Sequence, residues 1–306
     1  MAAFFPLEQK GVSTQKYLCT NKQEPSRNKT IKMSIKISLF VVPAIALVLH
    51  AASTMAMNPA TSVALSLRGG SIDKIYAGTV VAQGALDYLS PKTVNKLYNC
   101  DLSDKFSSFI QTYVGGNQAA TAIALYATIF SDVDAVKAIG YALVPSVLNN
   151  VKALLDGTPG ELGINVPMQY LNLAIVAFTT KSLIGGADNA ETILKYYLGY
   201  VVLATLQCRL APQSALKAWG FPEGTKLQTF ATKLLGQSGL AFAAAAYTLG
   251  VEGGDAAKAV GRVALTYLIN IVGFLASGDF AEIGVDVSKC YPWIGLSAVT
   301  AAILLQ

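Results

Sequence analysis

The sequence predicts an all-α integral membrane protein with about eight transmembrane helices, arranged as two parallel tandem four-helix repeats. The chain of 306 residues is 53% hydrophobic and only 13% charged, whereas soluble domains carry roughly 25% charged residues. Its mean hydropathy is +0.47. The apolar residues fall into separate runs of helical length, and the runs of the first part resemble those of the second. Lipid is therefore the expected solvent.

The N-terminal part is predicted to be a targeting leader. From Met33, a basic start at Lys36 precedes a short apolar run and then small residues, which is typical of a signal peptide. The run is too short to span a bilayer comfortably. We expect a polar extension or misassigned start at 1–32, a signal peptide at 33–57 and a presequence or linker at 58–72.

The stretch after the apolar run, AMNPATSVALSLRGG, contains the sequence LRGG. It resembles the presequence ends of diatom-type algal proteins of the secretory route or the plastid. Plastid-targeted members carry a cleavage motif like A-F-A-P, whereas this chain has Ala56-Met57-Asn58-Pro59. The resemblance implies the secretory or endomembrane system, with a plastid membrane as the alternative.

The remainder of the chain is predicted to be an internal duplication. Residues 74–185 align with 195–306 without a gap. KIYAGTVV corresponds to KYYLGYVV, DAVKAIG to DAAKAVG, and ELGINV to EIGVDV. We expect one four-helix repeat at 73–186 and a second at 187–306. Since four spans return the chain to its starting side, both repeats should have the same orientation about an axis along the membrane normal.

Each repeat contains four apolar runs, which we expect to be the helices. They lie near 73–89, 106–130, 135–155 and 167–184, and near 194–210, 228–250, 256–276 and 290–305. This Ala- and Gly-rich layout resembles the DoxX-like four-helix membrane proteins, a resemblance of layout that implies no site. Small residues four apart on the second run of each repeat predict close helix packing, at Ala120, Ala124, Ala241 and Ala245.

Composition excludes several functions. The net charge of +5 is spread between apolar runs without a basic stripe, so we expect no nucleic acid partner. The four cysteines lie far apart, and the one histidine, His50, falls in the leader. Because His-based catalysis and His metal sites need imidazole, we expect no enzyme activity, metal site or cofactor.

Asn149 and Asn270 occupy the same position in the third run of each repeat. A polar amide in hydrocarbon usually finds a partner on a neighbouring helix, at about 0.6 to 2 kcal/mol. Symmetric polar residues inside a membrane are also typical of pathways. Both interpretations stay open.

Acidic residues give three further candidates. Glu161 and Glu282 precede the last run of each repeat, where they are expected to cap the following helix, and cation or proton binding is the alternative. Asp134 and Asp255 are expected to cap the third run. Asp87 lies near the end of the first run and has no acidic equivalent in the second repeat, so it is either an interfacial residue or part of a proton relay.

Two functions follow from these features. The first is transport of a small solute or ion between the repeats, which predicts a polar cavity between the halves. The second is a structural or assembly subunit without transport or catalysis, which predicts a dry core and an apolar surface for a membrane protein or a second copy of the chain. No substrate can be named from the residues.

Overall fold

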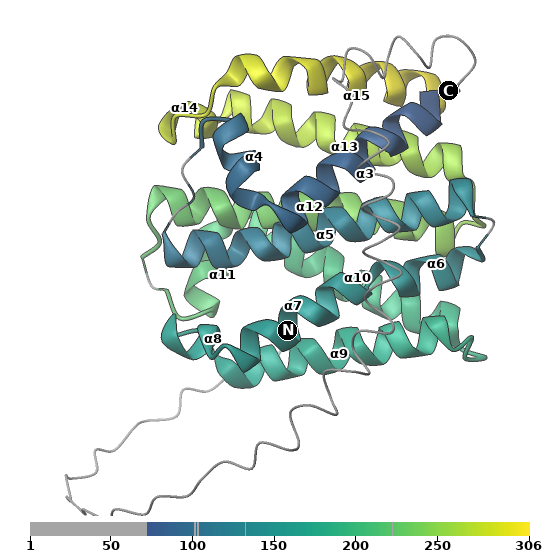
Figure 1. The fold of residues 1–306 in the computed structure, drawn as a ribbon, viewed down its shortest axis with the longest axis horizontal. Coiled ribbons are helices and arrows are strands. Elements are labelled where there is room, and N and C mark those ends of the chain that lie inside the picture. Colours follow the sequence, from purple (N-terminus) through teal and green to yellow (C-terminus); the bar gives the residue numbers. More distant parts are fainter. Residues whose placement is uncertain (1–71, 101, 103, 132, 222) are drawn as a thin grey trace, which may run out of the picture. The chain divides into compact units, whose positions relative to one another are not determined.

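The computed structural model describes residues 72–306 with the exception of 101, 103, 132 and 222 (Figure 1). The predicted extension at 1–32 and signal peptide at 33–57, and all but the last residue of the presequence at 58–72, lie outside the described residues. All regular secondary structure in the described ranges is helical. The all-α prediction is therefore confirmed for this part of the chain.

The first half, 72–186, begins with a helix that is followed by a short one, and ends with a long helix. Its helices are α3 (Ile72–Leu89), α4 (Pro91–Leu97), α5 (Lys105–Phe130), α6 (Ala135–Ala142), α7 (Val144–Leu155), α8 (Thr158–Glu161) and α9 (Val166–Ile184). The second half, 187–306, has the same order. Its helices are α10 (Ala190–Leu210), α11 (Pro212–Ala218), α12 (Lys226–Gly250), α13 (Ala256–Ala276), α14 (Asp279–Glu282), η1 (Val287–Cys290) and α15 (Tyr291–Leu304).

Every predicted apolar run is helical, with ends close to the predicted ones. The third run is the exception, because it is divided into α6 and α7 at Leu143. Pro145 lies in the first turn of α7, and proline removes a backbone donor and its ring collides with the preceding helical turn. The equivalent position of α13 is Thr266, and α13 is continuous.

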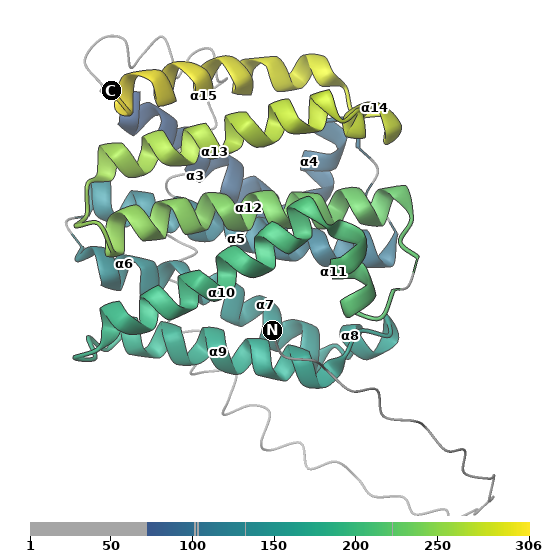
Figure 2. The same cartoon turned by 180° about the vertical axis from the view of Figure 1, so that it is seen from behind.

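The central pair of helices joins the two halves. α5 and α12 lie side by side and run in the same direction, from the side of α4 and α11 to the side of α6 (Figures 1 and 2). Asn117 Nδ2 donates to Ser238 Oγ at 3.2 Å, and these two residues are 121 positions apart. The four alanines predicted to pack are at most 1% exposed, namely Ala120, Ala124, Ala241 and Ala245.

A glycine lies at the helix crossing in each half. A Cβ on Gly115 of α5 would stand 2.6 Å from the carbonyl oxygen of Asp87 on α3. A Cβ on Gly236 of α12 would stand 2.7 Å from the backbone nitrogen of Arg209 on α10. These close approaches are possible only without a side chain.

The first helix of each half, α3 or α10, also contacts helices of the other half. α3 packs on α13 and α15 of the second half, where Tyr76 Oη and Ser297 Oγ form a buried hydrogen bond of 3.0 Å. α10 packs on α9 and α6 of the first half. The halves therefore interlock through both of these helices.

Three described segments are long and apolar enough to cross a membrane. They are Ala135–Leu155, which comprises α6 and α7, Ala256–Ala276 and Val287–Leu304. The other long helices contain more polar or charged side chains, such as Asp73, Lys74 and Asp87 in the 18 residues of α3. Length and composition thus support three of the eight predicted spans.

Candidate functional site

A cavity of about 170 Å³ lies between the two halves, near the end of α3 and the start of α5. Its walls come from α3, α4 and α5 of the first half and from α12, α13 and the α14–α15 segment of the second. Roughly 10–15 Å³ on this measure holds one water molecule, so the cavity has room for a small organic molecule. Its carboxyl and amide lining consists of Gln83, Asp87, Asn95, Gln111, Gln118 and Gln237.

Asp87 is the acidic residue of the cavity. It lies one turn after Gln83 on α3, and Gln83 Nε2 donates to its Oδ2 at 2.9 Å. The residue is 6% exposed. Its other oxygen, Oδ1, accepts no hydrogen bond from the described residues. A buried carboxylate is costly unless it is paired, so a cationic partner in the cavity would stabilise the ionised form of this side chain.

The amides of the cavity divide into satisfied and unsatisfied groups. Asn95 Nδ2 donates to Gln111 Oε1 at 3.0 Å, and Gln111 Nε2 donates to Asn95 Oδ1 at 2.6 Å. These two side chains therefore satisfy each other. Gln118 Oε1 is buried and has no hydrogen-bond partner in the described part of the chain. Unpartnered buried polar atoms are rare in proteins and need an explanation.

The remaining wall is aromatic and aliphatic. Its rings belong to Tyr98, Phe230, Tyr267, Phe280 and Trp293. No lysine, arginine or histidine is among the residues that line the cavity. The lining is therefore mainly apolar, with five amides and a single acidic group.

The equivalent place in the other half, 121 residues further along for α3 to α5, carries other side chains. The polar residues of α3, α4 and α5 are replaced there by Ala204, Cys208, Leu216, Thr232 and Gly239. Leu216 and Cys208 are 0% and 4% exposed. The ring of Phe221 stands at the position of Cys100 and packs at 4.5 Å from the ring of Phe106. The residues of α10, α11 and α12 that replace the cavity's polar residues thus include no carboxylate.

The counterpart position has a polar network of its own, which is internally satisfied. Asn172 Nδ2 donates to Asn150 Oδ1 at 3.0 Å, and Tyr200 Oη donates to Asn172 Oδ1 at 3.2 Å. Asn150 Nδ2 donates to the carbonyl oxygen of Ser146. These side chains hold α7, α9 and α10 together, so they act as helix contacts.

Asn149 and Asn270 are not brought together. Asn149 Nδ2 donates to the carbonyl oxygen of Thr112 on α5 at 2.8 Å. Asn270 is 6% exposed and its Oδ1 accepts from Arg209 Nε at 2.7 Å. Each amide thus bonds a helix of its own half, and neither is among the residues that line the cavity.

Glu161 and Glu282 form matching exposed ion pairs. Lys105 Nζ lies 2.6 Å from Glu161, and Lys226 Nζ lies 3.1 Å from Glu282. Each pair ties the first turn of α5 or α12 to the short helix α8 or α14. The following helices are capped by other side chains, namely Asn165 and Asp286. The capping interpretation of the two glutamates is therefore wrong.

The predicted caps of the third run are present. Asp134 accepts a hydrogen bond from the backbone nitrogen of Lys137, and Asp255 accepts one from that of Lys258. These carboxylates satisfy backbone donors at a helix start. Their role is structural in both halves.

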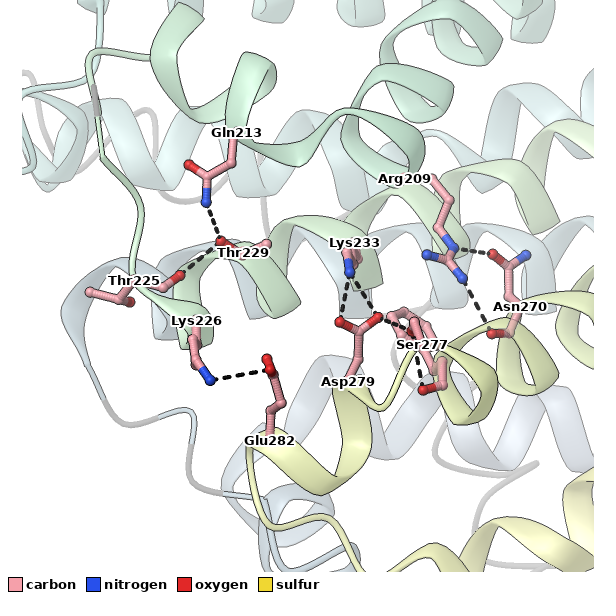
Figure 3. Close-up of polar contacts among 11 residues, drawn as sticks. Arg209, Gln213, Thr225, Lys226, Thr229, Lys233, Asn270, Ser277, Asp279 and Glu282 are labelled. Carbon is pink, nitrogen blue, oxygen red and sulfur yellow. Dashed lines mark hydrogen bonds and ion pairs between the residues drawn. The ribbon is translucent and has the colours of Figure 1, made fainter.

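A polar cluster that the sequence did not predict lies beside α12 (Figure 3). Lys233 Nζ contacts both carboxylate oxygens of Asp279, at 2.6 and 2.8 Å, and both side chains are largely buried. Ser277 Oγ donates to the same carboxylate. Burial alone would raise the pKa of Asp279, but hydrogen bonds from Lys233 and Ser277 outweigh it and lower that pKa.

Arg209 lies next to this cluster (Figure 3). Its guanidinium carbon stands 4.3 Å from the centroid of the Phe274 ring, in addition to the bond to Asn270. The equivalent residues of the first half are neutral: Tyr88 for Arg209, Thr112 for Lys233 and Thr158 for Asp279. The presence of these charged residues in only one of two otherwise similar halves was the sequence signal that could have indicated this cluster.

The amides of the cavity also went unpredicted. Gln111 and Gln118 are seven residues apart, which places both on one face of α5, and Gln83 and Asp87 share a face of α3. This periodicity is visible in the sequence. The sequence does not show which two helices cross. In the described ranges there is also no group of three His, Cys, Asp or Glu residues that could hold a metal ion.

No family model, curated protein or solved structure matches this chain. The resemblances to diatom-type presequences and to DoxX-like proteins therefore stay predictions.

Proposed function

We propose that this chain is an integral membrane protein whose two four-helix repeats bind a small solute in the cavity between them and pass it across the bilayer. The observation that carries the proposal is the buried carboxylate of Asp87 in a cavity formed by both halves. Intramembrane ionisable residues usually mark solute or proton pathways.

The exposed surface supports the membrane part of the proposal. Large apolar side chains project from α9, α10, α13 and α15, with Tyr196 at 79% exposure and Leu203 at 72%. Soluble monomers rarely expose contiguous apolar patches of this kind. Lipid tails would cover them. α5, with 26 residues, extends ~39 Å at 1.5 Å per residue, against about 30 Å of hydrocarbon.

The bounds of the helices support the proposal that the chain consists of two repeats. α4, α6 and α8 each begin 121 residues before α11, α13 and α14. α5 and α12 run in the same direction (Figures 1 and 2), as expected for parallel repeats related by an axis along the helices. We propose on this basis that all eight long helical segments cross the membrane.

Location follows from the predicted leader. We propose the secretory or endomembrane system, with a plastid membrane as the alternative. N-terminal sequencing of the native protein tests this, and a start between Ala52 and Leu67 is expected. A native chain that retains 1–30 would contradict the predicted leader.

Reconstitution tests the transport function. Purified protein in liposomes should move at least one class of solute faster than protein-free liposomes, across a panel of small amines, inorganic cations, carboxylates and polyols. Asp87→Asn should reduce that flux about tenfold or more. Asp188→Asn is the matched control, because Asp188 is exposed in the turn between α9 and α10, and it should leave the flux unchanged.

A second function, a structural or assembly subunit, is favoured by one observation. Buried alanines pack closely between α5 and α12, as expected for a protein whose two halves are joined by a dry interface. The exposed apolar surface would then contact a membrane protein or a second copy of the chain. Flux equal to that of empty liposomes for every solute in the panel would replace transport with this function.

A further inference from the structure

The cavity between the halves has the charge of a cation site. Asp87 supplies a carboxylate, and no basic side chain lines the cavity to neutralise it. Removing an ion from water costs several kcal/mol in a protein interior unless a partner compensates it. A ligand with a positive charge would supply that compensation, whereas an anion would add to the cost.

Two of the unpaired polar atoms in the cavity are acceptors that favour a ligand that donates. Asp87 Oδ1 and Gln118 Oε1 are both acceptors without a donor among the described residues. α3 and α5 cross where these residues lie, since a Cβ on Gly84 would meet the backbone of Gln118 at 2.8 Å. The two acceptors therefore face the same space from adjacent helices. An ammonium group has three donors and no acceptor.

A bare inorganic cation fits less well. Calcium needs six to eight oxygen ligands, and magnesium needs near-ideal octahedral geometry. The oxygens of Asn95 and Gln111 are already used in their mutual hydrogen bonds. The other carboxyl and amide oxygens of the lining, those of Asp87 and of Gln83, Gln118 and Gln237, number at most five and do not complete such a shell.

The rest of the wall fits an apolar body attached to the charge. Tyr98, Tyr267 and Trp293 line the cavity together with aliphatic side chains. Aromatic faces attract ammonium groups and also bury hydrocarbon. The volume of about 170 Å³ accommodates more than an ion.

We infer that the cavity binds one small organic ammonium ion per chain, with its charge paired to Asp87 and its hydrocarbon part against the aromatic wall. The stoichiometry is one because the counterpart position carries Cys208 instead of a carboxylate. This inference rests on the proposed function, since it takes the cavity to be the solute site.

Binding to the full-length protein in detergent tests the inference. The probes are n-butylammonium, n-butanol and butyrate, which share a hydrocarbon chain and differ in charge. Calorimetry should show n-butylammonium bound about tenfold or more tighter than either other probe, at one per chain. This comparison uses the unaltered protein, so it does not depend on how a variant folds.

Variants then assign the charge to its residue. Asp87→Asn should abolish the preference for n-butylammonium over n-butanol, and Gln118→Leu should weaken n-butylammonium binding severalfold. Asp188→Asn should change neither. Equal binding of n-butanol, two ammonium ions per chain, or an unchanged preference in Asp87→Asn would each overturn the inference.

The outcomes separate this inference from the transport function. Ammonium binding without any flux in liposomes would support the inference and contradict transport. Flux of a neutral or anionic solute through a protein that does not bind n-butylammonium would support transport and overturn the inference.

Discussion

The cavity and its counterpart position are built by equivalent helices and differ in what lines them. The cavity presents Asp87 and four amides from α3, α4 and α5, whereas the counterpart presents Cys208, Leu216 and smaller side chains from α10, α11 and α12. The surrounding packing is shared. Gly115 and Gly236 allow the same close helix crossing in both halves. The helix framework and the chemistry of the cavity are therefore carried by different residues.

The charged cluster beside α12 has charged residues in the second half and neutral residues at the equivalent positions of the first half. Lys233 and Asp279 form a buried pair in the second half, where the first half has Thr112 and Thr158. This pair does not line the cavity. Asp87 and the Lys233–Asp279 pair are thus buried charged groups at two separate places, one proposed to bind a solute and one that stabilises a helix connection.

The largest expected effect comes from breaking this pair. Lys233→Thr leaves the buried carboxylate of Asp279 without its cation, and we expect a loss of about 3–5 kcal/mol in the free energy of unfolding. The double variant Lys233→Thr, Asp279→Thr reproduces the neutral residues of the first half and should recover most of that loss. Denaturation in detergent measures both. A double variant as unstable as the single one would contradict the account.

Because both halves have the same close helix crossing, a larger residue at either crossing glycine should lower the free energy of unfolding by a similar amount. Gly115→Ala and Gly236→Ala each place a methyl group within 3 Å of backbone atoms, and overpacking of this kind costs about 1–3 kcal/mol. Gly199→Ala is the control, because a Cβ there meets no atom within 4 Å, and it should be neutral or stabilising by up to about 1 kcal/mol. Destabilisation in one half alone would show that the crossings are not equivalent.

The two asparagines should differ in their contribution. Asn270→Leu removes the acceptor of the half-buried Arg209 Nε, and leaving this donor unpaired should cost about 1 kcal/mol, at the lower end of the range for buried donors. Asn149→Leu removes one bond to a backbone carbonyl, and we expect about 0.6 kcal/mol. Melting temperatures of the two variants provide the measurement. A larger loss in Asn149→Leu would reverse the expected order.

The smallest effect concerns Glu252 in the loop before α13. The hydrogen bond from Arg262, aided by Lys258, lowers the pKa of Glu252. Because the folded pKa lies below the unfolded value, near 4.3, this stabilisation is present above that value and is lost as the pH falls through the folded pKa. Glu252→Gln should therefore melt lower than the wild type at pH 7, and the difference should shrink below about pH 4. A difference independent of pH would contradict this.

Much of the helix framework could be predicted from the sequence. The apolar runs gave every long helix, because burial of hydrocarbon determines where such helices lie. The division at Leu143 was missed although Pro145 was visible, since proline is tolerated in membrane helices. The capping residues Asn165 and Asp286 were missed because the acidic residue at the start of each repeated segment was the more evident candidate.

The cavity could be predicted only in part. Asp87 was recognised as an unusual carboxylate, but its environment depends on a contact between α3 and α5 and on side chains of α12 and α13, far away in the sequence. Spacing along one helix cannot show which helices cross. Asn149 and Asn270 were prominent because they are repeated, and the structure places them in helix contacts outside the cavity lining.

One position between the halves holds an acidic cavity and its counterpart does not. The reactivity of two cysteines measures this difference directly. Cys290 lines the cavity, and Cys208 is buried at the counterpart position. Their rates of reaction with the methanethiosulfonates of ethylammonium and of ethylsulfonate, read by mass spectrometry, give a cation-to-anion ratio in which the pKa of each thiol cancels. The ratio at Cys290, divided by the same ratio for 2-mercaptoethanol, should be about ten or more because of the local field. In Asp87→Asn this normalised ratio should fall towards one. Cys208 should react slowly with both reagents. A normalised ratio of one at Cys290, or Cys208 reacting as fast as Cys290, would contradict the account.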